Sequence, residues 1–285
     1  MQTQKRAGHS GLFAAVLSIG LLAAFTPPSS RASQPLETET ARFLEPGSCE
    51  LEGTVEYQTS REGSETSVPG AIEYGVTRWF EILIEPVAYT AIRPKSGANA
   101  TGAGDTEVTM TFRLRKESQF FPALATAAEI KFATANDTLI GTRKTDYAGY
   151  FIATKQLGQT DIHANIAYTV LGAPAGVSVN NIWNFALAGE WHATKSLDLV
   201  AEYLQNTSSS AASESPDSAP VANRRSAAFT AAATETALTP ELAGGEKVGM
   251  IGMRYRFNKT VSFAFGVTYD NSHAVLYRPG VTIRF

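Results

Sequence analysis

The sequence repeatedly alternates between apolar and polar residues over segments of about ten residues, the length that a tilted β-strand needs to cross a bilayer. In residues 105–116, Val108, Met110, Phe112 and Leu114 alternate with charged residues and threonines. The same period recurs in 160–171, 181–192 and 261–269. Because successive side chains of a strand point to opposite faces, each segment forms a strand with one apolar face and one polar face.

Twelve such segments cover the chain from residue 48 to its end. They are 48–58, 69–77, 79–90, 105–116, 121–134, 145–156, 160–171, 181–192, 196–206, 246–257, 261–269 and 274–285. Bacterial single-chain transmembrane barrels have an even number of strands. The predicted fold class is therefore all-β, a transmembrane antiparallel β-barrel of twelve strands over residues 48–285. Pro86 cannot donate a ladder hydrogen bond, so a bulge or bend is expected near it.

The lengths of the connections support a barrel. Connections after even-numbered strands are short, namely around Arg78 and at 117–120, 157–159, 193–195 and 258–259. Those after odd-numbered strands are mostly longer: 59–68, 91–104, 135–144, 172–180, 207–245 and 270–273. Outer-membrane barrels have short periplasmic turns and longer extracellular loops. Loop 207–245 is thus predicted to be extracellular, either as a mobile surface loop or as a constriction in the barrel mouth.

The two ends of the chain indicate export to the bacterial outer membrane. Lys5 and Arg6 precede an apolar run at 12–25, and small residues before Ser33 indicate a signal peptide, 1–32, cleaved near Ala32. Residues 33–47 are then expected to form a flexible periplasmic segment. The last strand ends on an aromatic residue, Phe285, which resembles the signal that such barrels present to the barrel assembly machinery. Outer-membrane lipid and lipopolysaccharide are further expected partners.

Composition excludes several classes of function. The formal net charge is −3, and removal of three basic leader residues leaves the mature chain near −6, which argues against nucleic acid as a partner. Cys49 is the single cysteine, so no intrachain disulfide or cysteine-cluster zinc site is expected. The four histidines have no HExxH spacing, and no P-loop or GxGxxG motif occurs. No cofactor and no metal are predicted.

The polar faces of the strands supply the candidate site, because they are expected to line the barrel lumen. The lumen-lining candidates are Glu107, Arg113, Arg115, Glu129, Lys131, Lys155, Asp161, His163, Asn165, Glu190, His192, Glu202, Arg254 and Arg256, with Arg284 as a further inward residue. Arg113 and Arg115 are expected near the periplasmic end, beside Glu129 or its neighbours. Two interpretations remain open: a network of ion pairs that fills the barrel, and a solute pathway lined by the same charges.

The middle of the chain, residues 100–170, resembles the family of outer-membrane transporters associated with the MetA pathway of phenol degradation. The shared pattern comprises Gly104-Asp105 before a strand that ends Arg113-Leu114-Arg115, then Pro122-Ala123 with Glu129 and Lys131, then Gly141 and Thr145-Asp146, and finally Thr154-Lys155-Gln156-Leu157-Gly158 running into 163–169. The C-terminal strand matches more loosely. Where the family has Pro-Thr, this chain has Ala133-Thr134. The resemblance implies a barrel that transports small molecules, with aromatic or apolar compounds as the implied solutes.

We therefore expect an outer-membrane channel for the passive passage of small molecules, and no enzymatic activity. One alternative is a closed barrel that serves structure or surface interactions without transport. A remote alternative is an outer-membrane lipid hydrolase, since one twelve-stranded family uses Ser, His and Asn, and here His163 and Asn165 share a face. That chemistry works at the lipid-facing wall, whereas these two residues lie on a polar face.

Overall fold

A computed structural model describes residues 35–173, 178–209 and 245–285. The predicted signal peptide 1–32 and most of loop 207–245 lie outside the described residues. Every regular element that the structure describes is a β-strand. Within these residues no helix is long and apolar enough to cross a membrane.

Fourteen strands follow one another along the chain. They are β1 (Cys49–Thr54), β2 (Glu56–Thr59), β3 (Gly63–Thr77), β4 (Phe80–Pro94), β5 (Ala100–Gly102), β6 (Thr106–Arg115), β7 (Ala123–Phe132), β8 (Asp146–Leu157), β9 (Thr160–Val170), β10 (Ile182–His192), β11 (Leu197–Asn206), β12 (Lys247–Arg256), β13 (Val261–Asp270) and β14 (Val275–Arg284).

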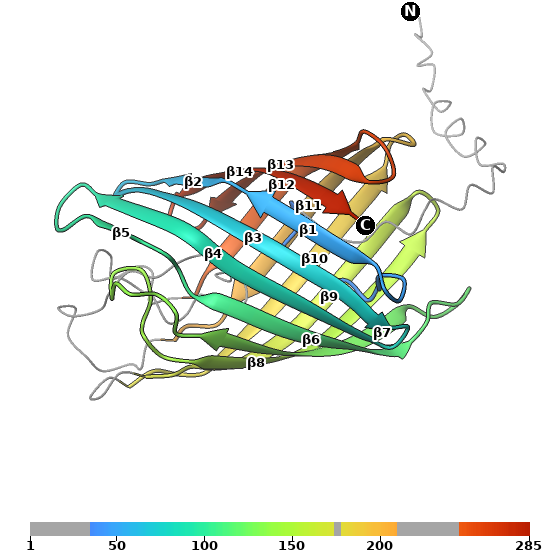
Figure 1. The fold of residues 1–285 in the computed structure, drawn as a ribbon, viewed down its shortest axis with the longest axis horizontal. Coiled ribbons are helices and arrows are strands. Elements are labelled where there is room, and N and C mark those ends of the chain that lie inside the picture. The colour runs from blue at the N-terminus through green and yellow to red at the C-terminus, as the bar shows by residue number, and fades with distance from the viewer. Residues whose placement is uncertain (1–34, 174–177, 210–244) are drawn as a thin grey trace, which may run out of the picture. The chain divides into compact units, whose positions relative to one another are not determined.

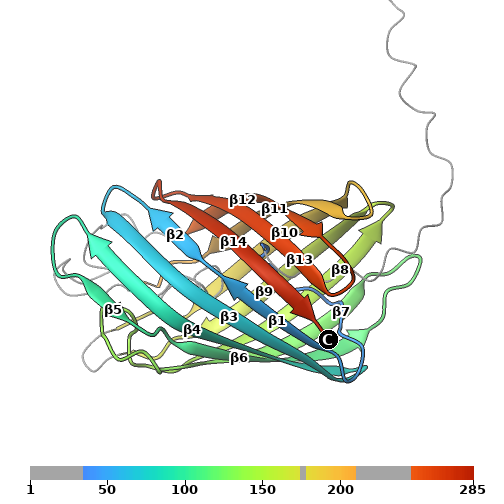
Figure 2. The ribbon, with the colours of Figure 1, turned by 45° about the horizontal axis from the view of Figure 1, so that its top comes forward.

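The strands form one antiparallel sheet that closes on itself. Neighbours in sequence pair from β6 to β14, and β1 closes the ring by pairing with both β14 and β3. The short strands β1 and β2 together fill one place in the ring, between β14 and β3, and β5 and β6 both pair with β4. The result is a closed twelve-stranded barrel, as predicted, with the tilted strands visible in Figures 1 and 2.

The strand bounds agree with the sequence pattern except around the first hairpin. β3 begins at Gly63 instead of 69 and β4 continues to Pro94 instead of 90, because the two strands stay paired from Gly63↔Pro94 onward. The expected loops 59–68 and 91–104 are correspondingly shorter. Near Pro86, Val68 pairs with Tyr89 and the next residue pairs with Val87, so the ladder skips Ala88. This is the bulge that the proline predicts.

Two ends of the barrel are distinguished by their connections. We call the end with the turns 78–79, 116–122, 158–159, 193–196 and 257–260 the turn end, and the opposite end the loop end. Connections 60–62 and 271–274 at the loop end are short, whereas 133–145 and 171–181 are long. The C-terminus follows β14 at the turn end (Figure 2).

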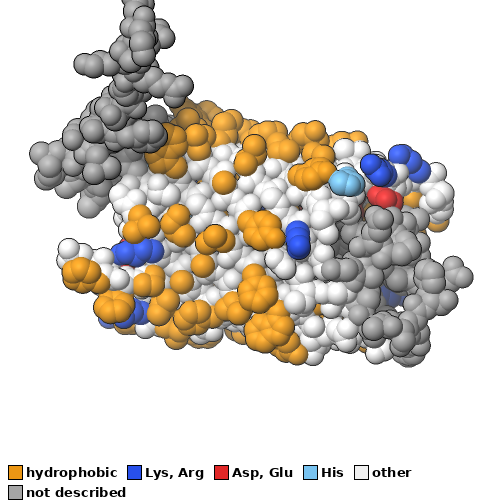
Figure 3. Space-filling model, turned by 180° about the vertical axis from the view of Figure 1, so that it is seen from behind, with side chains coloured by type: hydrophobic (Ala, Val, Ile, Leu, Met, Phe, Trp, Pro, Cys, Tyr) orange, Lys and Arg blue, Asp and Glu red, His pale blue; other side chains and the backbone are white. Residues whose placement is uncertain are grey.

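The outer face of the barrel is apolar. Large side chains such as Phe151, Phe185 and Leu187 alternate with buried neighbours and are about half exposed. In Figure 3, hydrophobic side chains spread over the middle of the surface seen, and charged ones lie mostly toward its ends. Exposed aromatic residues lie near the strand ends, as in the pair Tyr168 and Trp183, whose ring centroids are 4.9 Å apart. This distribution is typical of a lipid-facing barrel wall.

Residues 35–48, which we call the lumen segment, lie inside the barrel. This corrects the expectation of a flexible periplasmic segment at 33–47, of which residues 35–47 are described. Leu36, Phe43 and Leu44 are buried. Gly252 of β12 and Gly266 of β13 are cross-strand partners halfway along their strands. Pro35 packs directly against both glycines, since a Cβ atom on either would lie less than 3 Å from the Pro35 side chain. The segment therefore starts at mid-height in the lumen and leaves at the turn end, where it joins β1. Sequence periodicity misses it because its backbone pairs with side chains and not with another strand.

Candidate functional site: the charged lumen

One buried carboxylate, that of Glu202 on β11, holds the first half of the lumen segment. Its two oxygens accept hydrogen bonds from the backbone N–H of Glu37 at 3.1 and 3.0 Å, and one of them also accepts from the N–H of Thr38 at 2.5 Å. The Thr38 hydroxyl donates to the same oxygen. Hydrogen bonds to an ionised acceptor are among the stronger ones in proteins. Glu202 is thus a main attachment point of the segment.

Polar side chains of β8 and β9 hold the middle of the segment. The N–H of Ala41 donates to Thr154 Oγ1 at 2.9 Å, and that hydroxyl lies 3.0 Å from His163 Nδ1. Asn165 Nδ2 donates to the backbone oxygen of Glu39 at 3.1 Å. His163 and Asn165 therefore face the lumen, where His163 contacts the Thr154 hydroxyl and Asn165 contacts the backbone of the lumen segment.

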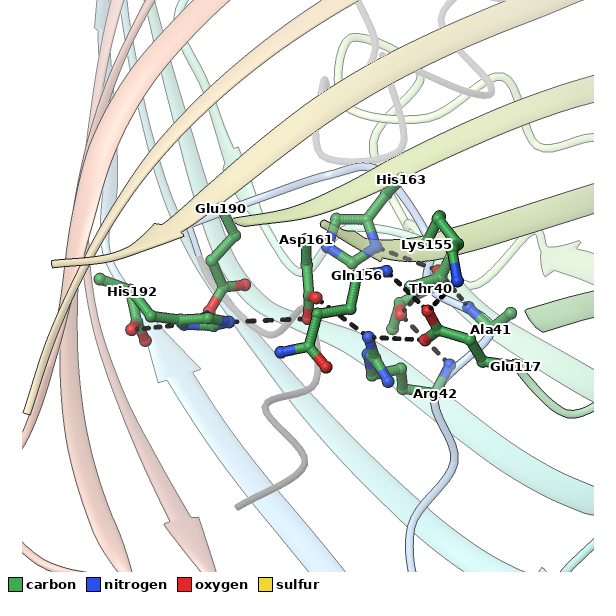
Figure 4. Close-up of polar contacts among 12 residues, drawn as sticks. Thr40, Ala41, Arg42, Glu117, Lys155, Gln156, Asp161, His163, Glu190 and His192 are labelled. Carbon is green, nitrogen blue, oxygen red and sulfur yellow. Dashed lines mark hydrogen bonds and ion pairs between the residues drawn. The ribbon is translucent and has the colours of Figure 1, made fainter. Parts of the chain in front are cut away.

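Ionic contacts hold the second half of the segment at the turn end. The Arg42 guanidinium lies 3.0 Å from Asp161 and 3.1 Å from Glu117. The Arg42 side chain thereby links β9 to the 116–122 turn. Figure 4 shows Arg42 between these two carboxylates. The N–H of Leu44 donates to Glu81 Oε2 on β4 at 2.5 Å.

Arg278 of β14 engages the start of the segment. Its guanidinium forms ion pairs with Glu37 of the segment and with Glu56 of β2, the latter at 2.9 Å, and donates to the Pro35 oxygen at 3.3 Å. Arg278 is 2% exposed. The segment thus contacts the barrel wall on β4, β8, β9, β11 and β14.

The inward faces of β10, β11 and β12 carry an ion-pair network at the turn end. Arg254 lies 2.8 Å from Glu190 and 3.7 Å from Asp198. Arg256 pairs with Asp198, and His192 Nδ1 lies 2.9 Å from the same carboxylate. Opposite charges that lie on neighbouring strands away from water require such pairing.

Glu190, His192 and Asp198 are also close enough to hold a metal ion, with ligand atoms within 4.8 Å of one another. Arg254 and Arg256 already neutralise both carboxylates. A divalent cation here would face two guanidinium groups, so the arrangement fits an ion-pair network better than a metal centre.

A different charge balance is found on the wall formed by β4, β6, β7 and β8. Glu85 of β4 and Glu107 of β6 are direct cross-strand partners, and Glu107 is also the partner of Lys131 on β7. The Lys131 ammonium forms an ion pair with Asp146 of β8. One lysine is therefore placed among three carboxylates.

Glu129 lies next to this group, one inward position nearer the turn end than Lys131 on β7. It is 7% exposed. Its Oε2 accepts from Tyr150 at 2.8 Å and from Thr109 at 3.3 Å, whereas its Oε1 has no hydrogen-bond partner among the described residues. Tyr150 is thus a lumen residue.

Two predicted lumen residues lie elsewhere. Arg113 faces inward with its guanidinium 4.2 Å from the Phe43 ring, but Arg115 stacks on Phe121 at the outer rim. A register shift explains the difference: Arg113 pairs with Ala125 and Arg115 with the next residue of β7, so one residue of β6 is skipped and the alternation changes sides. Arg113 is also not beside Glu129, where it was expected. The cross-strand partner of Glu129 is Thr109, four residues before Arg113 on β6.

Lys155 is the second correction. It lies between the inward-facing Thr154 and Gln156, on the opposite face of β8. Its ammonium contacts Glu117 at 2.9 Å and the Ser118 oxygen at 2.7 Å, which ties it to the 116–122 turn. The pattern Thr-Lys-Gln is polar on both faces, so periodicity alone does not orient it.

The remaining predicted residues lie on the inward faces of their strands. They are Glu107, Arg113, Glu129, Lys131, Asp161, His163, Asn165, Glu190, His192, Glu202, Arg254 and Arg256. Arg284 is also inward and lies 2.7 Å from Glu50.

Sequence reasoning missed the lumen segment and several acidic residues. Glu81 and Glu85 share a face of β4 with Leu83 and Val87, so the sequence left the phase of that strand ambiguous. Arg278 lies between the apolar residues Tyr277 and Pro279 in the last strand, and this alternation was sufficient to predict that Arg278 faces the lumen.

Comparison with known proteins supports the fold. No family model matches the sequence, and no curated protein matches it either. Among solved structures, the COG4313 outer membrane channel from Pseudomonas putida F1 superposes with a TM-score of 0.59 at 11% identity, over 86% of this chain and 98% of that chain. The NanC porin gives 0.54 at 10% identity, over 82% and 98%. The KdgM porin in complex with oligogalacturonate gives 0.51 at 10% identity, over 83% and 99%. The chain thus has the fold of outer-membrane channels.

Proposed function

We propose that this protein is an outer-membrane channel for the passive passage of small molecules, and that the lumen segment narrows its pathway. The observation that carries the proposal is a closed barrel with an apolar outer face and a charged inner face. The turn end would face the periplasm and the loop end the exterior. Assembly through the strand ending at Phe285, and contacts with lipid and lipopolysaccharide, belong to the same proposal.

The solute class follows less directly. The resemblance of residues 100–170 to the MetA-pathway family supports small aromatic or apolar compounds. Oligogalacturonate is the ligand of the KdgM porin, and it carries many carboxylates. The acidic wall of β4, β6 and β7 in this chain gives no support for that ligand.

The test is the conductance of the folded protein in planar bilayers, with the mature chain compared with a variant that lacks residues 33–44. Removal of the segment should raise the size of the conductance steps, because its backbone and the Phe43 ring occupy the lumen. Folding of each form would be checked by heat-modifiable mobility in gel electrophoresis. Absence of steps in both folded forms would contradict the channel.

A second candidate function is a closed barrel that serves structure or surface interactions. It is favoured by the density of the contacts that the lumen segment and the Arg254 network make at the turn end. The same conductance experiment separates the two, since a closed barrel stays silent after segment removal. We infer no lipid-hydrolase activity, because His163 and Asn165 face the lumen.

A further inference from the structure

We propose that the turn end of the barrel carries, on its outer side, a binding site for the phosphate headgroup of an anionic phospholipid, formed by Arg78, Arg115 and Lys116. We call these three residues the rim cations. The inference rests on the membrane placement in the proposed function, and it names a lipid class and its contacts where that proposal names only lipid.

A bulge in β6 places one of the rim cations on the outer side of the barrel. The ladder between β6 and β7 skips Leu114, so Arg115 pairs with Leu124 and its side chain turns away from the lumen. The Arg115 guanidinium carbon lies 4.2 Å from the centre of the Phe121 ring. A charged side chain on the lipid-facing side of a barrel is tolerated near the membrane interface and is costly at mid-height. Arg115 is the last residue of β6, so it lies where the outer wall reaches that interface.

Hydrogen bonds bring the turn between β3 and β4 alongside the end of β6. The N–H of Arg113 donates to the Trp79 oxygen at 2.9 Å, and the Arg113 guanidinium donates to the Arg78 oxygen at 2.5 Å. Arg78 therefore lies next to the last residues of β6, and Lys116 follows that strand directly. All three rim cations are exposed. Clustered cations at a membrane surface attract anionic lipid headgroups.

The one acidic residue of these two turns is held on the other side of the wall. Glu117 lies 3.1 Å from the Arg42 guanidinium and 2.9 Å from the Lys155 ammonium, each through a different carboxylate oxygen. The oxygen nearer Lys155 also accepts from the N–H of Gln156. Both oxygens are thus engaged by β8 and the lumen segment. The headgroup that complements the rim cations is a net anion, because the ammonium of a zwitterionic headgroup would be repelled by them.

Apolar side chains beside the rim cations provide a surface for the acyl chains of the same lipid. Phe120 is 82% exposed, and Leu114 and Phe121 are more than half exposed. The stacked rings of Phe80 and Phe112, with centroids 4.8 Å apart, continue this surface along β4 and β6. Binding to an anionic lipid surface gains from buried apolar area and from charge attraction together. A free anion would use the cations alone, whereas a phospholipid uses both features.

The first measurement uses Trp79, which follows Arg78 in the turn, as a local reporter. The mature chain with Trp183 and Trp191 replaced by phenylalanine would be folded into bilayers of phosphatidylcholine with a minor fraction of phosphatidylglycerol. An equal amount of one lipid or the other would carry bromine near the headgroup, so that the surface charge stays the same. Brominated phosphatidylglycerol should quench Trp79 several-fold more strongly than brominated phosphatidylcholine. Arg115→Gln should remove this preference, because it takes away the cation that lies over the apolar surface.

Two controls make the readout specific to the rim cations. A variant that keeps Trp191 as its single tryptophan reports on the same end of the barrel at β10 and should show a smaller preference. Lys259→Gln removes an exposed cation from the 257–260 turn, several strands away from β6 in either direction, and should leave the preference at Trp79 unchanged. If Arg115→Gln fails to fold, Lys116→Gln takes its place.

The second measurement separates the phospholipid from other sources of phosphate. Thermal unfolding of the mature chain in a neutral detergent would be followed with increasing phosphatidylglycerol, lipopolysaccharide or inorganic phosphate at constant ionic strength. A ligand that binds only the folded chain raises Tm. Phosphatidylglycerol should give a saturable rise that Arg115→Gln reduces, and neither of the other two should give a rise that depends on Arg115.

The outcomes distinguish the site from the membrane placement. Equal quenching of Trp79 by the two brominated lipids, or a preference that survives in Arg115→Gln, would overturn the site and leave the barrel in the membrane. A rise in Tm that depends on Arg115 with lipopolysaccharide or inorganic phosphate, and not with phosphatidylglycerol, would also overturn it. A Trp79 quenched by neither lipid would contradict the placement of this end in the membrane, and with it the site.

Discussion

At the scale of single residues, the buried acids of the lumen differ in what neutralises them. Glu190 faces an arginine, whereas Glu202 accepts the backbone N–H groups of the lumen segment. Asp146 forms an ion pair with Lys131 and accepts a hydrogen bond from the N–H of Gly172. Because a buried charge is costly when its partner is removed, substitutions at these positions should have different and predictable effects.

The first prediction concerns Glu202→Ala. The change removes the acceptor of two backbone N–H groups and of the Thr38 hydroxyl. A hydrogen bond to a charged group contributes about 1.5–3 kcal/mol, so the segment should open at least about tenfold more often. The measurement is the rate of trypsin cleavage after Arg42 in the folded barrel. Tyr203→Phe, which removes a hydroxyl from the outer face of the same strand, should leave the rate unchanged. Equal rates for Glu202→Ala and wild type would show that Glu202 does not hold the segment.

The second prediction concerns the pair Lys131 and Asp146. Lys131→Met leaves a buried carboxylate without its cation and should lower the free energy of unfolding by about 3–5 kcal/mol. The double variant Lys131→Met, Asp146→Leu should recover much of the loss, because neither charge then remains buried. Urea unfolding followed by tryptophan fluorescence measures both. Lys155→Met removes a partly exposed pair and should change stability by less than about 1 kcal/mol. Strictly additive losses in the double variant would contradict the pairing.

At the scale of elements, small side chains on the wall make room for the lumen segment. Ala123, Ala125 and Ala127 occupy successive inward positions of β7, and they share an apolar cluster with Phe43. A barrel whose inward residues were all large would fill its own lumen. The alanines of β7 therefore position the segment by leaving a space of its size.

The third prediction tests that space. Ala125 is fully buried, and Ala125→Phe should overfill the cluster at a cost of about 1–3 kcal/mol. We expect the segment to be displaced and trypsin cleavage after Arg42 to accelerate. Phe43→Ala on the same background should restore protection by returning the volume. Continued protection of Arg42 in the Ala125→Phe variant would show that the ring of Phe43 does not need this space.

The strands were predictable from sequence, and the lumen segment was not. Residues 105–116 were expected as one strand and β6 covers 106–115, because lipid on one side and polar groups on the other impose a strict period of two. The bulge that turns Arg115 outward depends on the register with β7, which no local pattern encodes. The lumen segment binds through Thr154, Glu202 and Asp161 on distant strands, so its position is set by tertiary contacts alone.

At the scale of the whole barrel, strand length and the aromatic residues indicate how it would sit in a bilayer. The ten residues of β6 extend over about 33 Å, which at a tilt of about 40° covers roughly 25 Å, the height of the apolar band of such barrels. Trp183 lies at the loop end, and Trp79 and Trp191 lie at the turn end. All three indoles are about half exposed. The indole N–H favours the interface between lipid and water at both ends.

The last prediction follows from this placement. Single-tryptophan variants, with the other two indoles replaced by phenylalanine, would be folded into bilayers whose lipids carry bromine either near the headgroup or near the chain ends. Each indole should be quenched more strongly by the shallow bromines than by the deep ones, because all three lie at an interface. Comparable quenching of Trp183 and Trp191 would mean that both ends reach the membrane boundary, as a spanning barrel requires. An indole quenched by neither lipid would place its end of the barrel in water. Strongest quenching by the deep bromines would place the tryptophan near the bilayer centre, which strands of this length do not allow.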